Sequence, residues 1–297
     1  MRIIKVEDLT HVYPSGKGIF DVTFNIERGE AFGYLGPNGA GKTTTIRNLM
    51  GFCNANSGVA MIDGHDCRKK AHFLQCMIGY LPGEIAFFDA MTGIEFLKFL
   101  CNMRRMRDDT RMYEMVKMFE LDPTGRIKKM SKGMKQKLGI VAAFMHDPEI
   151  YILDEPSSGL DPLMQTVFLD LIETEKKRGK TILMSSHSFD EVERCCDRAG
   201  IIKDGRIVSI QDIASLKKIK RNVYIFTVAR TRDYDRIMGS NLNTKRISDH
   251  RVAVEIKDNF NDMFNLLSGC NVTNMEVKPQ TLENVFMKYY KKDGETS

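Results

Sequence analysis

The chain has 297 residues, 42% of them hydrophobic, and a formal net charge of +5. This length accommodates one large domain and a smaller one, and the charge is too small to indicate nucleic acid by itself. There is no apolar run of about eighteen residues and no secretory signal pattern, and seven cysteines without a C-x-x-C pair indicate reduced cytosolic thiols rather than disulfides or zinc.

Residues 2–35 are predicted to form strands that lead into a glycine-rich loop. Val22–Ile26 alternates between apolar and polar side chains, and Ala31–Leu35 is a short, largely apolar strand. The loop Gly36–Thr43 follows, and Thr44–Gly51 has the apolar spacing of a helix. A strand, a glycine loop and a helix in this order place phosphate at the helix N-terminus.

The loop fits the phosphate-binding pattern G-x-x-x-x-G-K-[ST]. Its glycines let consecutive N–H groups face an anion, while Lys42 reaches the β- and γ-phosphates and the Thr43 hydroxyl helps to hold Mg²⁺. The alternative is a glycine-rich turn without a ligand. We expect a nucleoside triphosphate to bind at Gly36, Pro37, Asn38, Gly39, Ala40, Gly41, Lys42, Thr43 and Thr44.

A helical pattern from Asp89 to Glu120 separates this loop from a second strand, Ile150–Leu153, which leads into Asp154 and Glu155. A carboxylate at the end of a buried strand, in a protein with a phosphate loop, is placed to bind Mg²⁺ directly or through water. If the strand alternation persists, Glu155 points away from Asp154 and polarises the attacking water. The alternative is a solvated acidic turn.

Another buried strand is predicted at Thr181–Ser186, and Asp204-Gly205 indicates a hairpin within Ile201–Val208. After about residue 220 the pattern becomes that of a small α+β region with the order β-α-β-β-α-β and a terminal helix. Within it we assign two strands, Val223–Val228 and Arg251–Ile256, and two helices, Phe264–Leu267 and Leu282–Phe286. The region contains no recognisable chemical motif.

Three further segments stand in a fixed order around the acidic pair: Met130–Lys137, Ser158–Pro162 and His187. With the phosphate loop, they make residues 1 to about 215 resemble the nucleotide-binding subunit of an ATP-binding cassette (ABC) transporter. The resemblance implies an α/β fold with a P-loop NTPase core, an antiparallel β subdomain and a helical insert at about 85–145. It implies an ABC ATPase domain at 1–219 and a small α+β accessory domain at 220–297.

The resemblance also implies roles for single residues, with ATP and Mg²⁺ bound and with Lys42, Glu155 and His187 as the catalytic set. Tyr13 stacks on the adenine, the alternative being a half-buried strand tyrosine. Ser131 and Gly133 cap the γ-phosphate bound to a second subunit, and Asp161 couples the two sites. His187 touches the γ-phosphate, the alternative being a histidine satisfied at a strand end.

The chain departs from the family pattern at two places. Gly83 stands where the family has a glutamine, so its role is vacant or passes to Glu84, which we include with Thr43 and Asp154 as a metal ligand. In the segment Met130–Lys137, Lys132 and Met134 replace the usual glycine and glutamine. Lys132 either adds a cation near the nucleotide or is solvated.

These departures and the segment Thr281–Met287 resemble exporter-type cassettes whose permease is a separate polypeptide. The resemblance implies a peripheral ATPase on the cytoplasmic face of the membrane, acting as a homodimer or paired with a related subunit. Phe87 and Phe88 are candidate permease contacts, the alternative being helical core. Two other functions are a soluble ABC-type ATPase that acts on the ribosome or nucleic acid, and an ATP-binding self-protection or regulatory module. We expect no nucleic-acid partner.

Overall fold

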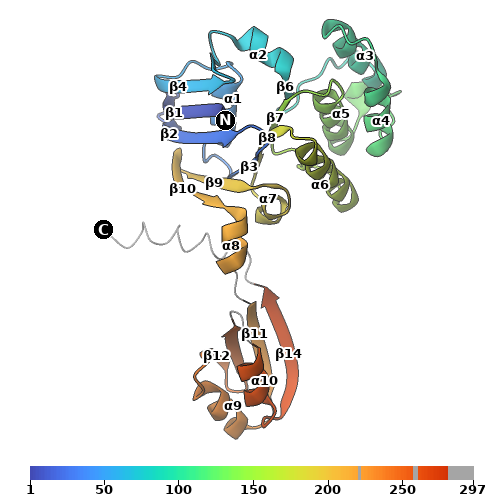
Figure 1. The fold of residues 1–297 in the computed structure, drawn as a ribbon. Coiled ribbons are helices and arrows are strands. Elements are labelled where there is room, and N and C mark those ends of the chain that lie inside the picture. The colour runs from blue at the N-terminus through green and yellow to red at the C-terminus, as the bar shows by residue number, and fades with distance from the viewer. Residues whose placement is uncertain (220–221, 257–259, 280–297) are drawn as a thin grey trace. The chain divides into compact units, whose positions relative to one another are not determined.

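The computed structural model describes residues 1–219, 222–256 and 260–279. The chain divides into two compact units, Met1–Ile213 and Ala214–Ser297 (Figure 1). The sequence placed the boundary a few residues later, after residue 219. In the described residues, no helix has the length and hydropathy that crossing a bilayer requires.

A mostly parallel sheet of six strands forms the centre of the first unit, in the order β10-β9-β3-β8-β7-β6. Its strands are β3 (Ala31–Leu35), β6 (Ile78–Leu81), β7 (Ile150–Asp154), β8 (Thr181–Ser186), β9 (Arg198–Lys203) and β10 (Arg206–Asp212). Every residue of β3, β7 and β8 is buried, as expected for parallel strands that are covered on both faces. Only β10 runs antiparallel to its neighbour, through the predicted Asp204-Gly205 turn.

A second sheet is antiparallel, in the order β2-β1-β4-β5. Its strands are β1 (Arg2–Val12), β2 (Gly18–Glu27), β4 (Ser57–Ile62) and β5 (His65–Asp66). Phe24 on β2 stacks on Phe32 and Tyr34 of β3, with ring centroids 5.4 and 5.5 Å apart. The main core therefore lies between the two sheets, and Ile46 of α1 (Lys42–Leu49) packs into it.

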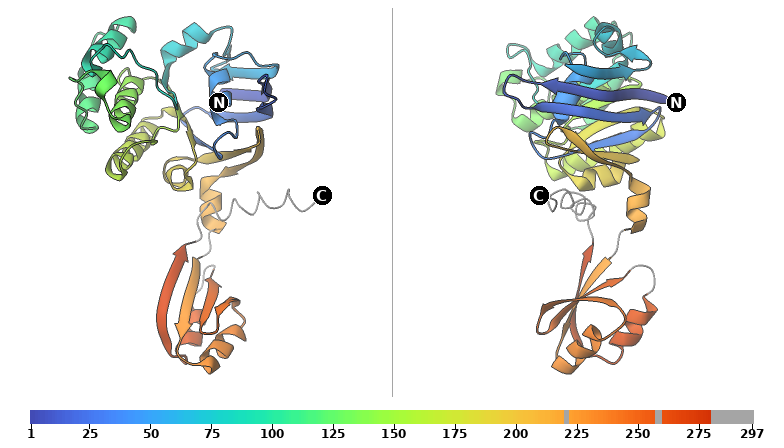
Figure 2. Two further views of the ribbon diagram at one scale, coloured as in Figure 1. Left: turned by 180° about the vertical axis from the view of Figure 1, so that it is seen from behind. Right: turned by 90° about the vertical axis from the view of Figure 1, so that its left-hand side faces the viewer.

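The helical insert lies beyond β6 and β7, on the side of the unit opposite the antiparallel sheet (Figure 2). Its helices are α3 (Gly93–Met103), α4 (Thr110–Met118), the short 3₁₀ turn η1 (Ile127–Lys129) and α5 (Lys132–Phe144). The single helical stretch predicted from Asp89 to Glu120 is divided, because the chain turns at Arg105, whose φ is +52°. The preceding helix α2 (Ala71–Met77) was not predicted.

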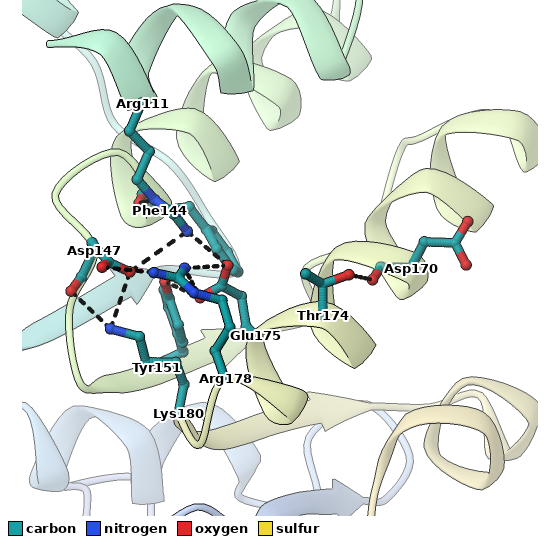
Figure 3. A network of polar contacts seen from close by, with 9 residues as sticks. All are labelled: Arg111, Phe144, Asp147, Tyr151, Asp170, Thr174, Glu175, Arg178 and Lys180. Carbon is teal, nitrogen blue, oxygen red and sulfur yellow. Dashed lines mark hydrogen bonds and ion pairs between the residues drawn. The ribbon is translucent and has the colours of Figure 1, made fainter.

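A buried polar network joins the insert to the core at the start of β7 (Figure 3). Glu175 of α6 (Pro162–Lys177) is 1% exposed and accepts hydrogen bonds from Arg111 of α4 at 2.7 Å, Arg178 at 2.9 Å and Tyr151 of β7 at 3.1 Å. Burial, and then the charge of Glu175, raises the pKa of Tyr151. Asp147 closes the network by pairing with Arg178 at 2.9 Å. One carboxylate thus links α4, α6 and β7.

The second unit contains an antiparallel sheet in the order β12-β13-β11-β14. Its strands are β11 (Asn222–Val228), β12 (Asn243–Ser248), β13 (Arg251–Ile256) and β14 (Val272–Pro279), and its helices are α9 (Thr231–Met238) and α10 (Asn261–Leu267). The predicted order β-α-β-β-α-β is therefore present. Phe226, Val254, Ile237 and Met263 share its core. The helix predicted at Leu282–Phe286 lies outside the described residues.

Two further helices complete the described elements, α7 (Phe189–Cys195) after β8 and α8 (Ile213–Ile219) after β10. All seven cysteines are free thiols, as their number and spacing predicted. Burial raises the pKa of Cys195 to about 12, which keeps this thiol protonated at neutral pH. Cys67, Cys101, Cys195 and Cys196 are buried packing residues, whereas Cys76 is exposed.

Candidate nucleotide-binding site

The glycine loop connects the end of β3 to the first turn of α1. Gly41 immediately precedes the helix with φ +112°, and a Cβ there would lie 2.6 Å from Ile19. Only glycine fits this position, on both backbone and steric grounds. The first turn of α1 contains no acidic residue, so its N–H groups and the helix dipole favour an anion at this end.

Lys42 is 4% exposed and its ammonium group is held over the loop. Its Nζ donates to the carbonyl oxygens of Gly36 at 2.6 Å and Pro37 at 3.2 Å, and it lies 3.1 Å from Oε1 of Glu155. A buried cation is stable only when it is paired or hydrogen-bonded, and these three oxygens meet that need. The same ammonium is available to phosphate oxygens that replace them.

Asp154 ends β7 and is fully buried. Its Oδ2 accepts from the Thr43 hydroxyl at 2.7 Å, and its Oδ1 accepts from the Ser185 hydroxyl at 2.6 Å. Ser185 is the β8 residue paired with Asp154 in the parallel ladder, so the sheet itself fixes this carboxylate. Thr43 and Asp154 therefore present hard oxygen atoms side by side, the ligand type that Mg²⁺ prefers.

Glu155 does not continue the strand. Its φ is +48°, so the alternation on which the sequence interpretation depended ends at Asp154. The Glu155 carboxylate reaches Lys42, and its Oε2 lies 3.7 Å from Nδ1 of His187. The condition on which the expectation of opposite directions depended is therefore not met, because the chain turns at this residue. Asp154 thus contacts Thr43 of the phosphate loop, and Glu155 contacts Lys42 of the loop and lies near His187, which follows β8.

Lys42, Thr43, Asp154 and Glu155 line a cavity of about 570 Å³. Tyr13 and the loop residues from Pro37 to Thr44, except Ala40, are part of its wall, as are Asp154, Glu155 and Glu84. Gly36 and Ala40 do not line the cavity, and Ala40 is buried. The lining residues that the sequence interpretation missed are Lys17, Gly18, Arg47, Tyr80, Pro82 and Ser158.

Two of the missed residues had a signal in the sequence. Arg47 is four residues after Thr43 on α1, a spacing that puts both on one face of the helix. Tyr80 is on β6, next to β7, which leads into the acidic pair. Burial, with the charge of Asp154 as the next cause, raises the pKa of Tyr80 to about 12. The phenol therefore stays neutral beside the acidic site.

Comparison with known proteins agrees with this geometry. The family model described as ABC transporter matches residues 19–158. The ABC transporter ATP-binding protein NatA of Bacillus subtilis (strain 168) is 36% identical over 219 residues, which are 71% of this chain and 89% of NatA. The chain belongs to the ABC transporter ATP-binding proteins. The bacitracin transport ATP-binding protein BcrA of Bacillus licheniformis is 36% identical over 76% of this chain and 75% of its own.

A solved structure of the ATP-binding subunit of an ABC transporter has the same fold. It aligns with a TM-score of 0.66 and 30% identity, over 73% of this chain and 92% of that one. The resemblance inferred from the ordered motifs is thereby confirmed, as are the α/β fold and the ATPase class. This ABC ATPase binds nucleotide and powers transport.

Besides Gly36 and Ala40, four predicted residues of the ABC ATPase do not line the cavity of their own chain: Ser131, Gly133, Asp161 and His187. Ser131 is the N-cap of α5, with its hydroxyl accepting from the Met134 N–H at 3.2 Å. Asp161 caps α6 in the same way, accepting from the Met164 N–H at 3.0 Å. The side chain of His187 is 63% exposed beyond β8. These capping bonds give Ser131 and Asp161 a role in local structure as well.

The unusual Gly83 lies directly beside the acidic site. A Cβ at this position would be 3.2 Å from Oδ2 of Asp154, so any side chain here would start toward that carboxylate. Glu84 lines the cavity and is exposed to solvent. A side chain at position 83 would therefore begin next to Asp154.

Proposed function

We propose that the chain is the ATPase subunit of an exporter, that it works as a dimer, and that it docks on a separate membrane permease at the cytoplasmic face. The proposal of ATPase activity is supported by one observation: Lys42, Thr43, Asp154 and Glu155 line the same cavity and contact each other in pairs. Residues 1–219 are the catalytic domain in this proposal, with the insert at about 85–145, and residues 220–297 are the accessory domain.

In the proposed reaction, Lys42 exchanges its carbonyl partners for the β- and γ-phosphate oxygens and neutralises the charge that develops there. Its ion pair with Glu155 then opens, and the Glu155 carboxylate orients the attacking water and takes its proton. His187, near Glu155, contacts the γ-phosphate. Tyr13 provides an apolar platform for the adenine.

Thr43 and Asp154 would hold Mg²⁺, with Glu84 as a third candidate. The described residues contain no cluster of three or more His, Cys, Asp or Glu side chains that could hold a metal ion. That fits a metal bound through one carboxylate, one hydroxyl and substrate phosphates, which is the usual arrangement for Mg²⁺. When bound, Mg²⁺ neutralises charge on the β- and γ-phosphates.

A dimer gives a function to Ser131 and Gly133, which lie outside the cavity of their own chain. We propose that they cap the γ-phosphate bound to the second subunit, and that Asp161 couples the two sites. The second subunit is another copy of this chain or a related ATPase subunit.

The permease contact that we propose is an apolar groove of about 270 Å³ beside the insert. It is lined by residues of β6, α3 and α5, and by Phe87, whose ring lies 5.1 Å from that of Phe96. Phe88 is 56% exposed and contacts the ring of Phe99 at 5.8 Å. Exposed aromatic side chains that rim a groove are typical of a protein interface.

Phe88→Glu tests this partnership. The variant should keep the ATPase activity of the isolated chain but should no longer be recovered with a membrane protein, since a charge is introduced beside Phe96 of the groove. Val59→Glu is the control, because Val59 is 41% exposed on the antiparallel sheet, away from the groove. If Phe88→Glu and the wild type recover the same membrane partner equally, Phe88 is not part of the contact. Recovery of ribosomal RNA in place of a membrane protein would support the soluble alternative.

A further inference from the structure

A group of exposed cations lies at the start of α2. Arg68, Lys69 and Lys70 directly precede this helix, and all three residues are exposed. None of them forms an ion pair with another described residue. The carboxylate of Asp66 is occupied by the backbone, because its Oδ1 accepts the N–H groups of Arg68 at 3.0 Å and Lys69 at 2.8 Å. Three adjacent positive charges are thus left without a paired carboxylate in the described structure.

The helix itself gives no local reason for these charges. The first turn of α2 contains no acidic residue, and its N-cap, Lys70, makes no capping hydrogen bond through its side chain. The helix buries only Leu74, so packing contributes little to its stability. Charges that repel one another without a local gain point to a functional requirement.

Apolar side chains are exposed beside the same cations. Phe73 of α2 is 50% exposed. The end of α3 lies beside α2, because Nη1 of Arg104 donates to the carbonyl oxygen of Gln75 at 3.5 Å. Met103, which is 67% exposed, and Arg105, which is exposed, flank Arg104 in the chain. We call the following residues the basic surface: Arg68, Lys69, Lys70, Phe73, Met103 and Arg105.

The basic surface borders the groove that we propose for the permease. Gln75 and Arg104, which join α2 to the end of α3, both line that groove. Helices α2 and α3 lie at the same end of the first unit in each view (Figures 1 and 2). Because a permease lies within the bilayer, a chain that docks through the groove turns this border toward the membrane surface.

We propose that the basic surface binds the anionic lipid headgroups of the membrane next to the permease. Lysine and arginine side chains are attracted to an anionic leaflet, and an exposed aromatic ring gains by burial at the boundary between headgroups and acyl chains. Nucleic acid would also satisfy the charges, but the neighbouring permease groove favours the membrane. This inference rests on the proposed permease contact.

Sedimentation of the full chain with phospholipid vesicles tests this binding. The probe is vesicles of about one-third phosphatidylglycerol in phosphatidylcholine, and vesicles of phosphatidylcholine alone are the uncharged comparison. The four cations of the basic surface should give half-maximal binding to the charged vesicles at about 1 mM accessible lipid in about 0.1 M salt. Binding should be lost at about 0.5 M salt, because salt screens the charges, and the uncharged vesicles should bind little.

Two variants separate the contributions of charge and of the aromatic ring. Replacing Arg68, Lys69 and Lys70 together by Gln should weaken binding on the order of 100-fold, and Phe73→Ser should weaken it about tenfold. Both variants should keep the wild-type rate of ATP hydrolysis, because the side chains are exposed and lie outside the nucleotide cavity.

The matched control replaces Arg126, Lys128 and Lys129 together by Gln, which removes the same charge from exposed residues at η1. This segment lies at the other end of α3, because the N–H of Gly93 donates to the carbonyl oxygen of Gly125 at 3.2 Å. The 11 residues of α3 span about 16 Å. The control should therefore change vesicle binding by less than about threefold.

Three results would overturn the proposal: equal binding to charged and uncharged vesicles, equal losses in the triple variant and its control, or binding to a DNA duplex in place of vesicles. Recovery of a membrane protein distinguishes this failure from that of the proposed function. If the wild type recovers a membrane protein but binds no anionic vesicles, only the lipid contact is wrong. If it binds these vesicles through the basic surface but recovers no membrane protein, the lipid contact stands and the permease partnership is wrong.

Discussion

Glu175 provides the most direct test of how the insert is held to the core. Its carboxylate is 1% exposed and binds Arg111, Arg178 and Tyr151 (Figure 3). Glu175→Gln preserves the shape but removes the charge, so two guanidinium groups lose their buried partner. Losing one side of a buried ion pair costs about 3 to 5 kcal/mol of unfolding free energy.

The expected loss lies toward the lower end of that range. Arg178 is 40% exposed, so water replaces much of its interaction, whereas Arg111 is 21% exposed and contributes most. The amide oxygen of glutamine still accepts a hydrogen bond from Tyr151. We therefore expect Glu175→Gln to lower the free energy of unfolding by about 3 kcal/mol, or the melting temperature by roughly 9 °C.

Urea unfolding followed by circular dichroism measures this loss, and Glu173→Gln is the matched control. Glu173 is on the same helix and pairs with Arg194, but both side chains are about one-third exposed. Its removal should cost less than about 1 kcal/mol. Combining Glu175→Gln with Arg111→Gln should be clearly non-additive, because one contact is removed twice. Two results would refute the reasoning. One is a similarly small loss of unfolding free energy for Glu173→Gln and Glu175→Gln, and the other is additive losses in the double variant.

Four further predictions concern the cavity and its surroundings. Glu155→Gln should lower the hydrolysis rate by about 10² to 10⁴ while ATP binding persists, and a wild-type rate in a phosphate-release assay would exclude Glu155 as the base. Tyr13→Ala should weaken ATP and ADP equally, by about 1 to 3 kcal/mol in calorimetry, with Tyr13→Phe unchanged; loss of ATP binding alone would contradict the stacking role. Glu84→Gln should raise the Mg²⁺ concentration for half-maximal hydrolysis about tenfold if Glu84 holds the metal, and an unchanged value would remove it from the ligand set. Burial and then Arg104 lower the pKa of His146 from 6.5 to about 4, so the unfolded chain binds an extra proton between these values, and stability falls as pH drops through that window. Urea unfolding measures this effect. Between pH 6.5 and pH 5, the free energy of unfolding of His146→Gln should fall by about 2 kcal/mol less than that of the wild type. An identical pH dependence of the two proteins would contradict this prediction.

The strands of the central sheet were predictable because parallel strands are buried on both faces. Ala31–Leu35 and Thr181–Ser186 match β3 and β8 in full, since an apolar run between turn residues leaves little choice of boundary. β4 and α2 were not predicted, because β4 is largely exposed and α2 buries only Leu74, which leaves no clear period in the sequence.

The sequence predicted which residues form the site better than it predicted which of them pair with each other. The loop pattern identified Lys42, and the apolar strand before Asp154 identified the acid that contacts Thr43. The pairing of Lys42 with Glu155 was not predictable, because it depends on one backbone angle at Glu155. Local sequence period does not encode a positive φ in a glutamate, which is set by the turn that follows β7.

The ion pair between Lys42 and Glu155 has a consequence for the timing of catalysis. Before substrate arrives, the carboxylate that we assign as the base is held by the cation that we assign to phosphate. The triphosphate must compete for Lys42, and in doing so it frees Glu155. In this mechanism, one exchange at Lys42 both binds the nucleotide and frees the carboxylate that we assign to its hydrolysis.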